Sequence, residues 1–224
     1  MYSSMKQTEI EQARFNMIEQ QIRPWDVLDQ QVLDTMNAIH REDFVPERYR
    51  SLAFADTSIP LGHEQVMMPP KLEGRVLQAL AIAPADRILE IGTGSGYLTA
   101  CLASLGQHVT SFDIMPDFTA AAGETLQGMD IGNVSLHTAD VANGIDSDNR
   151  YDAIAVTGSL PMLQQQFHNN LSIGGRLFVI TGSLPIMEAW LITRVDENNW
   201  ARESLLETCI PPLQNADTTQ EFIF

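Results

Sequence analysis

The N-terminal part of the chain carries apolar residues at helical spacing. An amphipathic helix is predicted over residues 6–22. Its apolar positions, which fall roughly on one side, are Ile10, Phe15, Ile18 and Ile22. This helix should end at Arg23, because Pro24 disfavours helical geometry in the residue before it. Further helices are predicted over 29–39 and 71–82, each with its own apolar stripe.

From residue 87 onward, short β-rich runs alternate with helical runs. The predicted strands are 87–91, 108–114, 134–138, 151–158, 175–181 and 189–195. The predicted helices between the earlier strands are 96–105, 116–128 and 161–171. Such alternation indicates parallel strands joined by right-handed crossovers, with both faces of the sheet covered. The last runs lie closer together around "VDENNW" and indicate a terminal antiparallel hairpin. These elements predict an α/β fold with a Rossmann-like, doubly wound, mostly parallel sheet behind an N-terminal helical extension.

Composition and charge narrow the classes of function. Hydrophobic residues make up 44% of the chain and charged residues 19%, which is ordinary for a globular protein. The 13 Lys and Arg residues face 29 Asp and Glu residues, for a formal net charge of −16. Because nucleic-acid affinity comes largely from cationic side chains, nucleic acid is an unfavourable partner. No metal is expected, since neither cysteine stands in a metal-ligand spacing.

The same features predict where the protein works. Its N-terminal segment is polar and periodic and has no apolar signal-peptide core. No uninterrupted apolar run approaches the ~20 residues that span a bilayer. Two cysteines without a disulfide framework suit a reducing compartment. We therefore expect a soluble cytoplasmic protein without a membrane partner.

Three glycines crowd the turn that follows the strand predicted at 87–91. Gly92, Gly94 and Gly96 open the next helix, and glycine there permits positive φ and close approach of a ligand. A dinucleotide fingerprint reads G-x-G-x-x-G, whereas this chain has G-x-G-x-G after Glu90. The spacing disfavours a nicotinamide-dependent oxidoreductase. It resembles motif I of the S-adenosylmethionine-dependent methyltransferases, although glycines in such a turn also occur for structural reasons alone.

Residues at the ends of the following strands agree with a nucleoside cofactor. Asp113 stands 113 − 92 = 21 positions after the first glycine, where an acidic residue binds ribose hydroxyls in doubly wound folds. Asp140 resembles the methyltransferases' acceptor for the adenine amino group, and the fourth strand ends near Thr157. The expected cofactor is S-adenosyl-L-methionine. Its candidate ligands are Glu90, Gly92, Thr93, Gly94, Ser95, Gly96, Asp113, Ile114, Asp140, Val141 and Thr157.

A closer resemblance covers residues 15 to 213. The stretches "RILEIGTGSGYLTACLASLG", "YDAIAVTGSLP", "REDFVPERY" and "CIPPL" together resemble the protein-L-isoaspartate O-methyltransferase family. This resemblance implies methyl transfer to the carboxylate of L-isoaspartyl residues, a protein-repair activity. It also implies a single domain over 1–224. Residues 1–70 would form the helical extension and substrate loop, and 71–224 the S-adenosylmethionine-binding core.

The substrate loop departs from the family pattern. The family reads roughly G-Y-G-Q-T-I-S-x-P there, with Thr and Ser hydroxyls beside the reacting carboxylate. The candidate residues of this chain are Gly62, His63, Glu64, Gln65, Val66 and Met68. Gln65 and Pro70 keep the pattern, whereas Val66 and Met68 stand at the Thr and Ser positions. Loss of two hydrogen bonds to a charged group, each worth roughly 1.5–3 kcal/mol, would slow transfer about a hundredfold or more.

Several readings therefore stay open for this loop. Val66 and Met68 suit a different acceptor or simply pack the loop onto the core, and Glu64 would oppose an anionic acceptor if it pointed inward. His63 is either a base or a structural residue. The chain is expected to methylate a protein, a peptide or a small carboxylate. The alternative is a homologue that binds S-adenosylmethionine but lacks isoaspartyl activity. Both a monomer and a homodimer are compatible with the sequence.

Overall fold

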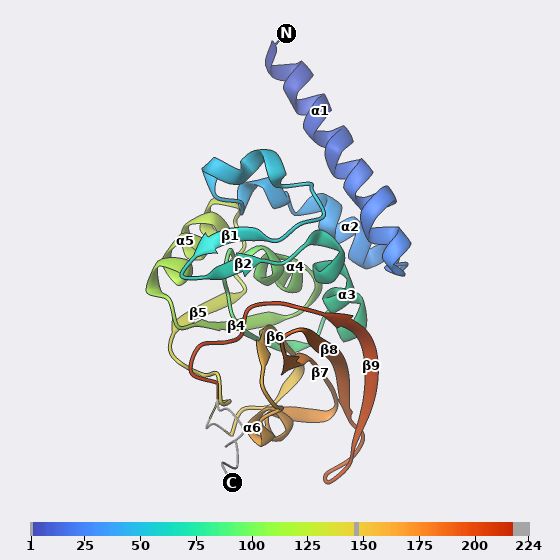
Figure 1. Ribbon diagram of the computed structural model, residues 1–224, viewed down its shortest axis with the longest axis vertical. Helices are drawn as coiled ribbons and strands as arrows, with labels where there is room; N and C mark the ends of the chain where they lie inside the picture. Colours follow the sequence, from blue (N-terminus) through green and yellow to red (C-terminus); the bar gives the residue numbers. More distant parts are fainter. Residues whose placement is uncertain (1, 146–147, 217–224) are drawn as a thin grey trace.

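A computed structural model describes residues 2–145 and 148–216, and it begins with a projecting helix (Figure 1). Helix α1 (Tyr2–Met17) continues as a π-helical turn, η1 (Ile18–Ile22), and a 3-10 turn, η2 (Arg23–Trp25). The predicted helix therefore exists, but its last turn is wider than an α-turn, and the backbone N–H of Arg23 bonds to the carbonyl of Ile18. Pro24 has no N–H with which to continue the α-helical pattern.

The rest of the N-terminal layer is built from short elements. Helix α2 (Gln30–Ala38) begins at Asp29, whose carboxylate accepts the backbone N–H of Gln31 at 2.8 Å as an N-cap. Two 3-10 turns follow, η3 (Arg41–Asp43) and η4 (Glu47–Leu52). The segment without clear periodicity also contains a small antiparallel hairpin, β1 (Ile59–Gly62) and β2 (Gln65–Met67). Helix α3 (Pro70–Leu80) then leads to the main sheet, close to its predicted range.

The main sheet has seven strands in the order β5-β4-β3-β6-β7-β8-β9. The strands are β3 (Arg87–Ile91), β4 (His108–Asp113), β5 (Val134–Thr138), β6 (Tyr151–Leu160), β7 (Leu171–Ser183), β8 (Ile186–Arg194) and β9 (Trp200–Thr208). The five strands β3 to β7 pair in parallel, and β8 and β9 are antiparallel. The predicted mostly parallel sheet with an antiparallel C-terminal end is confirmed. Chain order reverses direction between β3 and β6, where ligands collect at the carboxyl edge.

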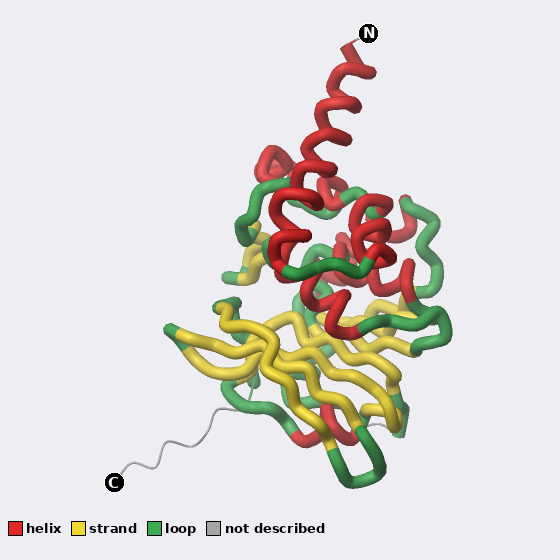
Figure 2. The backbone as a smooth tube through the Cα atoms, turned by 90° about the vertical axis from the view of Figure 1, so that its right-hand side faces the viewer, coloured by secondary structure: helices red, strands yellow, loops and turns green. Residues whose placement is uncertain are grey.

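The helices that follow the strands cover the sheet unequally. Helices α4 (Tyr97–Leu105) and α5 (Pro116–Gly128) agree with their predicted ranges. Helix α6 comprises only Gln165–Asn169, shorter than the predicted 161–171, because Leu171 already begins β7. Figure 2 shows most of the helical mass on one side of the sheet and a single short helix on the other.

Apolar side chains of the strands alternate between two core clusters. On β3, Ile88 belongs to the cluster beneath the N-terminal helices, and its neighbour Leu89 belongs to the cluster on the opposite face. This period of two is the geometry of a strand buried on both sides. Both residues are fully buried, so the strand that carries the glycine turn is fixed from above and below. Within the described ranges, no helix has the length and apolarity needed to cross a membrane.

Candidate functional site

Two of the three glycines in the turn are required by close packing. A Cβ on Gly92 (φ 97°) would lie 2.2 Å from Thr157 Oγ1 on β6, and one on Gly96 (φ 83°) would lie 2.8 Å from Ala122 Cβ on α5. At neither position is there room for a side chain. Gly94 differs, because an added Cβ would meet only a Leu61 methyl group, at 3.4 Å, on the wall of a cleft. The ligand-approach role expected of all three glycines therefore fits Gly94 best.

Glu90 lies beneath the turn rather than in the cleft. It is fully buried, and its Oε2 accepts the hydroxyls of Thr99 at 2.5 Å and Ser111 at 2.6 Å. Ser111 in turn lies 2.6 Å from the hydroxyl of Thr93. Burial raises the pKa of Glu90 to about 7 against the effect of these hydrogen bonds. Glu90 is not among the residues that line the cleft, so its position corresponds to a support for the turn instead of the predicted cofactor contact.

Asp113 joins the end of β4 to the glycine turn. Its Oδ2 accepts the backbone N–H of Gly94 at 2.8 Å, and its Oδ1 accepts the backbone N–H of Met115 at 2.9 Å. The side chain is largely buried, and this burial raises the pKa of the carboxyl group from its ordinary value. Asp113 nevertheless lines the cleft, as predicted, and each oxygen retains a lone pair for a ligand hydroxyl.

Asp140 faces the C-terminal end of the described chain. Its Oδ2 accepts the side-chain amide of Asn215 at 2.7 Å, and its Oδ1 accepts the backbone N–H of Ala142 at 3.2 Å. Residues 209–216 form a strap along β6, in which Leu213 donates its N–H to the carbonyl of Ser159 at 2.9 Å. Asp140 lies on the cleft wall, and its Oδ2 keeps a second lone pair for a ligand amino group beside the bond from Asn215.

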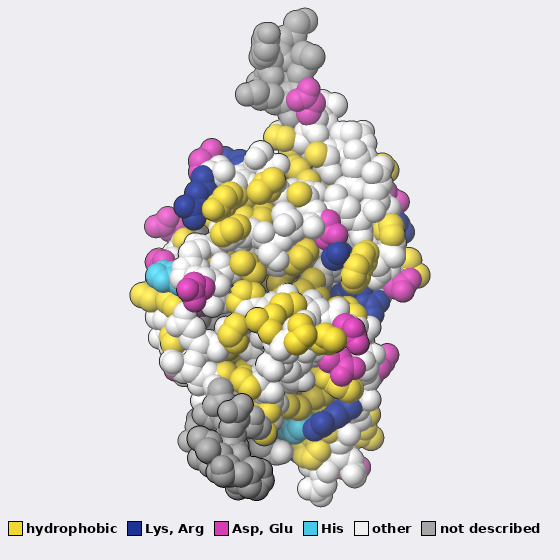
Figure 3. All heavy atoms as spheres, in the orientation of Figure 1, with side chains coloured by type: hydrophobic (Ala, Val, Ile, Leu, Met, Phe, Trp, Pro, Cys, Tyr) yellow, Lys and Arg dark blue, Asp and Glu magenta, His cyan; other side chains and the backbone are white. Residues whose placement is uncertain are grey.

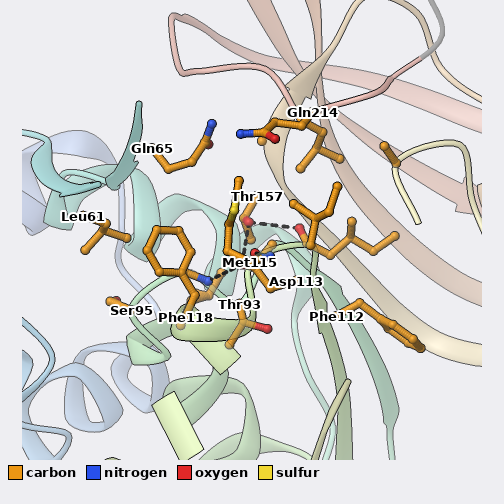
Figure 4. A pocket seen from close by; sticks show the side chains of 18 of the residues that line it. Leu61, Gln65, Thr93, Ser95, Phe112, Asp113, Met115, Phe118, Thr157 and Gln214 are labelled. Atoms are coloured by element: carbon orange, nitrogen blue, oxygen red, sulfur yellow. Dashed lines mark hydrogen bonds between the residues drawn. The ribbon is translucent and has the colours of Figure 1, made fainter. Parts of the chain in front are cut away.

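Almost all of the predicted cofactor residues come together in this one cleft. Besides the residues already placed, Thr93, Ser95, Ile114, Val141 and Thr157 line it, and only Glu90 and Gly96 do not. Figure 4 shows Asp113 and Thr157 near the centre of the cleft, whereas the Thr93 hydroxyl is bonded to Ser111 beneath the turn. The hydroxyl of Thr157 donates to the carbonyls of Ile91 at 2.9 Å and Gly92 at 2.7 Å. The cleft thus lies at the carboxyl ends of β3, β4 and β6.

The substrate loop divides into a cleft-facing half and a solvent-facing half. Gln65, Val66 and Met68 line the cleft, whereas Gly62, His63 and Glu64 do not. His63 (φ 50°) and Glu64 (φ 61°) form the exposed hairpin turn between β1 and β2. Glu64 is therefore exposed to solvent, and the inward orientation considered from the sequence does not occur.

His63 is engaged at this turn, outside the cleft. Its Nε2 lies 2.9 Å from Asp117 Oδ2, and its ring meets Phe118 edge to face at 5.6 Å. The hydrogen bond from His63 lowers the pKa of Asp117. This arrangement is that of a structural contact between the hairpin and α5, which fits the structural reading of His63.

A buried ion pair fixes the inner half of the loop. Arg41 is fully buried, and its guanidinium pairs with Glu73, donates to the carbonyl of Met68 at 2.7 Å, and lies 5.1 Å from the ring centre of Tyr97. Glu73 reaches the cleft wall, and its burial raises its pKa to about 8 despite Arg41. Neither residue was singled out from the sequence, because a lone Arg and a lone Glu thirty-two positions apart carry no pattern.

Other cleft residues were also missed. Apolar side chains form much of the wall, and the C-terminal strap contributes the outermost residues. The additional lining residues include Leu61, Met67, Leu98, Phe112, Met115, Phe118, Leu213 and Gln214. The alternating pattern of β4 marks Phe112, but nothing in the sequence marks Gln214. Figure 3 shows hydrophobic side chains gathered across the middle of this face of the molecule.

Known sequences resemble nearly the whole chain. The profile of the family described as protein-L-isoaspartate(D-aspartate) O-methyltransferase matches residues 12–210. A protein-L-isoaspartate O-methyltransferase of Rhodopseudomonas palustris is 34% identical over 206 residues, which cover 92% of this chain and 94% of the relative. One of Koribacter versatilis is 33% identical over 200 residues, which cover 89% and 90%.

Solved structures agree with the fold. A Plasmodium falciparum structure described as a protein-L-isoaspartate O-methyltransferase, in complex with S-adenosyl-L-homocysteine, superposes with a TM-score of 0.77. It is 20% identical and covers 90% of this chain and 98% of its own. A second structure of that enzyme name gives a TM-score of 0.76 at 22% identity, with 89% of this chain and 65% of its own covered.

Proposed function

This chain belongs to the protein-L-isoaspartate(D-aspartate) O-methyltransferase family, and we propose that it transfers the methyl group of S-adenosyl-L-methionine to isoaspartyl carboxylates of proteins or peptides. One observation carries the proposal. The glycine turn, Asp113 and Asp140 line a single cleft at the carboxyl edge of the parallel sheet. The long match to the family supports the same reaction class.

The polar groups in the cleft suit a nucleoside joined to an amino acid. Asp113 would hold the ribose hydroxyls, and Asp140 with Val141 would hold the adenine. The turn from Gly92 to Ser95 would hold the amino-acid end. None of the described residues that line the cleft carries a cationic side chain, which disfavours a pyrophosphate and suits a positively charged ligand. When bound, the cofactor supplies an electrophilic methyl group on a sulfonium, whose sulfur leaves as a neutral thioether.

The residues of the chain then have a modest chemical task. A carboxylate acceptor with a reference pKa near ~3.9 is already ionised at neutral pH, so no general base is needed. Orientation of the acceptor is the main contribution that the walls can make. Val66, Met67 and Met68 exclude water on the loop side, and Phe118 does so on the side of α5. A water-poor cleft favours a step in which opposite charges neutralise each other.

A second candidate is a methyltransferase with another acceptor. The apolar side chains of Val66 and Met68 face the cleft, and Glu73 adds a buried carboxyl group to the same wall. These groups offer an isoaspartyl carboxylate neither a hydroxyl nor a cation. They favour an acceptor that needs less polar assistance, or a homologue that binds the cofactor with little isoaspartyl turnover.

One assay separates these functions. The protein is incubated with methyl-labelled S-adenosyl-L-methionine and either an isoaspartyl peptide or its normal aspartyl counterpart, and base-labile methyl esters are counted. Esterification of the isoaspartyl peptide alone supports the proposal. Tight cofactor binding by calorimetry without any ester, under conditions in which an active family member gives ester, rules out the repair activity and leaves the second candidate.

Partner and location follow from this proposal. We infer a protein or peptide substrate and a cytoplasmic location, where the protein would encounter damaged proteins. Cys101 is buried and Cys209 is exposed, and both are free thiols in the structure. Fractionation of cells that express the tagged full chain would test the location.

A further inference from the structure

Two side-chain amides stand on opposite walls at the mouth of the cleft. Gln65 begins β2, and Gln214 lies in the C-terminal strap, so residues far apart in the chain meet here. Figure 4 shows the two amide groups directed toward one another across the opening. Gln65 is half-buried and Gln214 is exposed, which places the pair at the solvent side of the cleft.

Neither amide is used to hold the fold together. Among the described residues, the side chains of Gln65 and Gln214 form no hydrogen bond, unlike those of Asn215 and Gln78. The neighbouring Asn215 bonds to Asp140, and Gln78 binds the backbone N–H of Leu28 at 2.6 Å and the carbonyl of Asp26 at 2.5 Å. The donors and acceptors of the mouth pair are therefore available to a ligand.

The chemistry of the mouth differs from that of the wall behind it. Farther along the loop the wall consists of Val66, Met67 and Met68, and no cation among the described lining residues is present to bind an anion. A primary amide presents both N–H donors and a carbonyl acceptor, which complement the N–H and C=O of a peptide unit. A group that enters the cleft passes this pair before it reaches the interior.

We propose that Gln65 and Gln214 form an acceptor clamp that binds the peptide main chain flanking the methylated carboxylate. The clamp favours peptide and protein segments as acceptors over free small carboxylates, which have no flanking peptide units to bind. This inference rests on the proposed methyltransferase function. It assigns the choice of acceptor to two neutral side chains at the mouth, while the interior of the cleft holds the cofactor.

The variants Gln65→Ala, Gln214→Ala and the double variant test the clamp. For an isoaspartyl hexapeptide, each single variant should raise KM by about two- to tenfold, the effect of one net hydrogen bond, with kcat and the KM of the cofactor unchanged. The double variant should multiply these effects. For an isoaspartyl residue without flanking residues, whose KM is already high in the wild type, the variants should change little. Gln127→Ala, an exposed amide on α5, is the matched control and should change neither acceptor's KM.

Two outcomes would overturn the clamp. One is an unchanged KM for the hexapeptide in the double variant, and the other is an equal rise in KM for the long and the short acceptor. If the wild type methylates neither acceptor, the proposed function fails, and hexapeptide binding is measured by calorimetry on the protein loaded with sinefungin, an amine analogue of the cofactor. Binding that the double variant weakens still supports the clamp. No binding, or binding that the variant leaves unchanged, refutes it.

Discussion

The Asp113 carboxylate and the backbone N–H of Gly94 are joined by a hydrogen bond of 2.8 Å, so the end of β4 fixes the glycine turn that follows β3. A residue chosen for its spacing from the glycines therefore also shapes the turn itself. Two strands adjacent in the sheet are linked at the point where the cofactor is proposed to bind.

Replacement of Asp113 by Asn tests this double role. The amide can accept only through its single oxygen, and its NH2 group would face a backbone N–H. We expect the dissociation constant of S-adenosyl-L-homocysteine to rise about ten- to hundredfold, since hydrogen bonds to a charged group are worth roughly 1.5–3 kcal/mol. Isothermal titration calorimetry gives the value. Glu124→Gln, an exposed acid on α5, serves as the control, and equal affinity in both variants would exclude Asp113 from the cofactor site.

The buried Glu90 makes folding stability depend on pH. Its pKa is about 7 in the folded protein and near 4.5 when unfolded, so the folded state retains the proton that the unfolded state loses. The contribution of Glu90 to the free energy of unfolding should fall by about 3 kcal/mol as pH rises from about 4.5 to 7, and this contribution then levels off. Urea titrations at intervals of one pH unit measure the slope. In Glu90→Gln the slope between pH 4.5 and 7 should become shallower by this group's share, while the share of the buried Glu73, whose pKa is about 8, remains. A slope equal to that of the wild type would exclude a contribution from Glu90.

Gly96 should resist substitution more than a glycine elsewhere in the neighbouring helix. In Gly96→Ala the new methyl group meets Ala122 Cβ at 2.8 Å, and φ of 83° is unfavourable for alanine. We expect a loss of about 2–3 kcal/mol in the free energy of unfolding. Gly128→Ala, at the end of α5 with no atom within 4 Å, should change stability by less than about 1 kcal/mol. Similar losses in both variants would contradict the packing role of Gly96.

Restoring hydroxyls to the loop tests the departure from the family pattern. In the double variant Val66→Thr with Met68→Ser, kcat/KM for an isoaspartyl peptide should rise at least about tenfold. A hydrogen bond to a charged group contributes roughly 1.5–3 kcal/mol, and about 1.4 kcal/mol corresponds to a tenfold change in rate. Met68 is buried, so the variant should also unfold at a lower temperature. Activity is therefore measured well below that temperature. An unchanged or lower kcat/KM would show that the apolar loop is adapted to its acceptor as it stands.

Hydrophobic periodicity predicted the elements whose apolar runs are bounded by turn residues. The bounds of β3, β5 and α5 agree with their predicted ranges, because apolar runs and turn residues delimit them. Strand β9 was not predicted as a separate run, since its exposed edge carries charged residues such as Arg202 and Glu203 in place of an apolar alternation. Local sequence also could not show that α6 would be cut short by the length of β7.

The candidate site also contains residues that local sequence predicted and residues that it could not predict. Asp113 and Asp140 were found because parallel strands bring their ends to one edge, which is a property of the local sequence and the topology. Glu90 was predicted as a cofactor contact but lies beneath the turn, since an acid before the glycine turn is as compatible with a buried support as with a ligand contact. Glu73 and Gln214 reach the cleft only through tertiary packing, and no spacing rule connects them to the glycine turn.

The strap from residue 209 to 216 sets the order in which this cleft can be assembled during synthesis. The glycine turn, Asp113 and Asp140 leave the ribosome long before Leu213, yet Leu213 packs against Gly158 and completes the wall. Until that residue emerges, a nascent chain can form most of the sheet but has a cleft open on one side. A chain without the strap would keep the walls formed by the glycine turn, Asp113 and Asp140 but would lack the wall formed by Leu213 and Gln214.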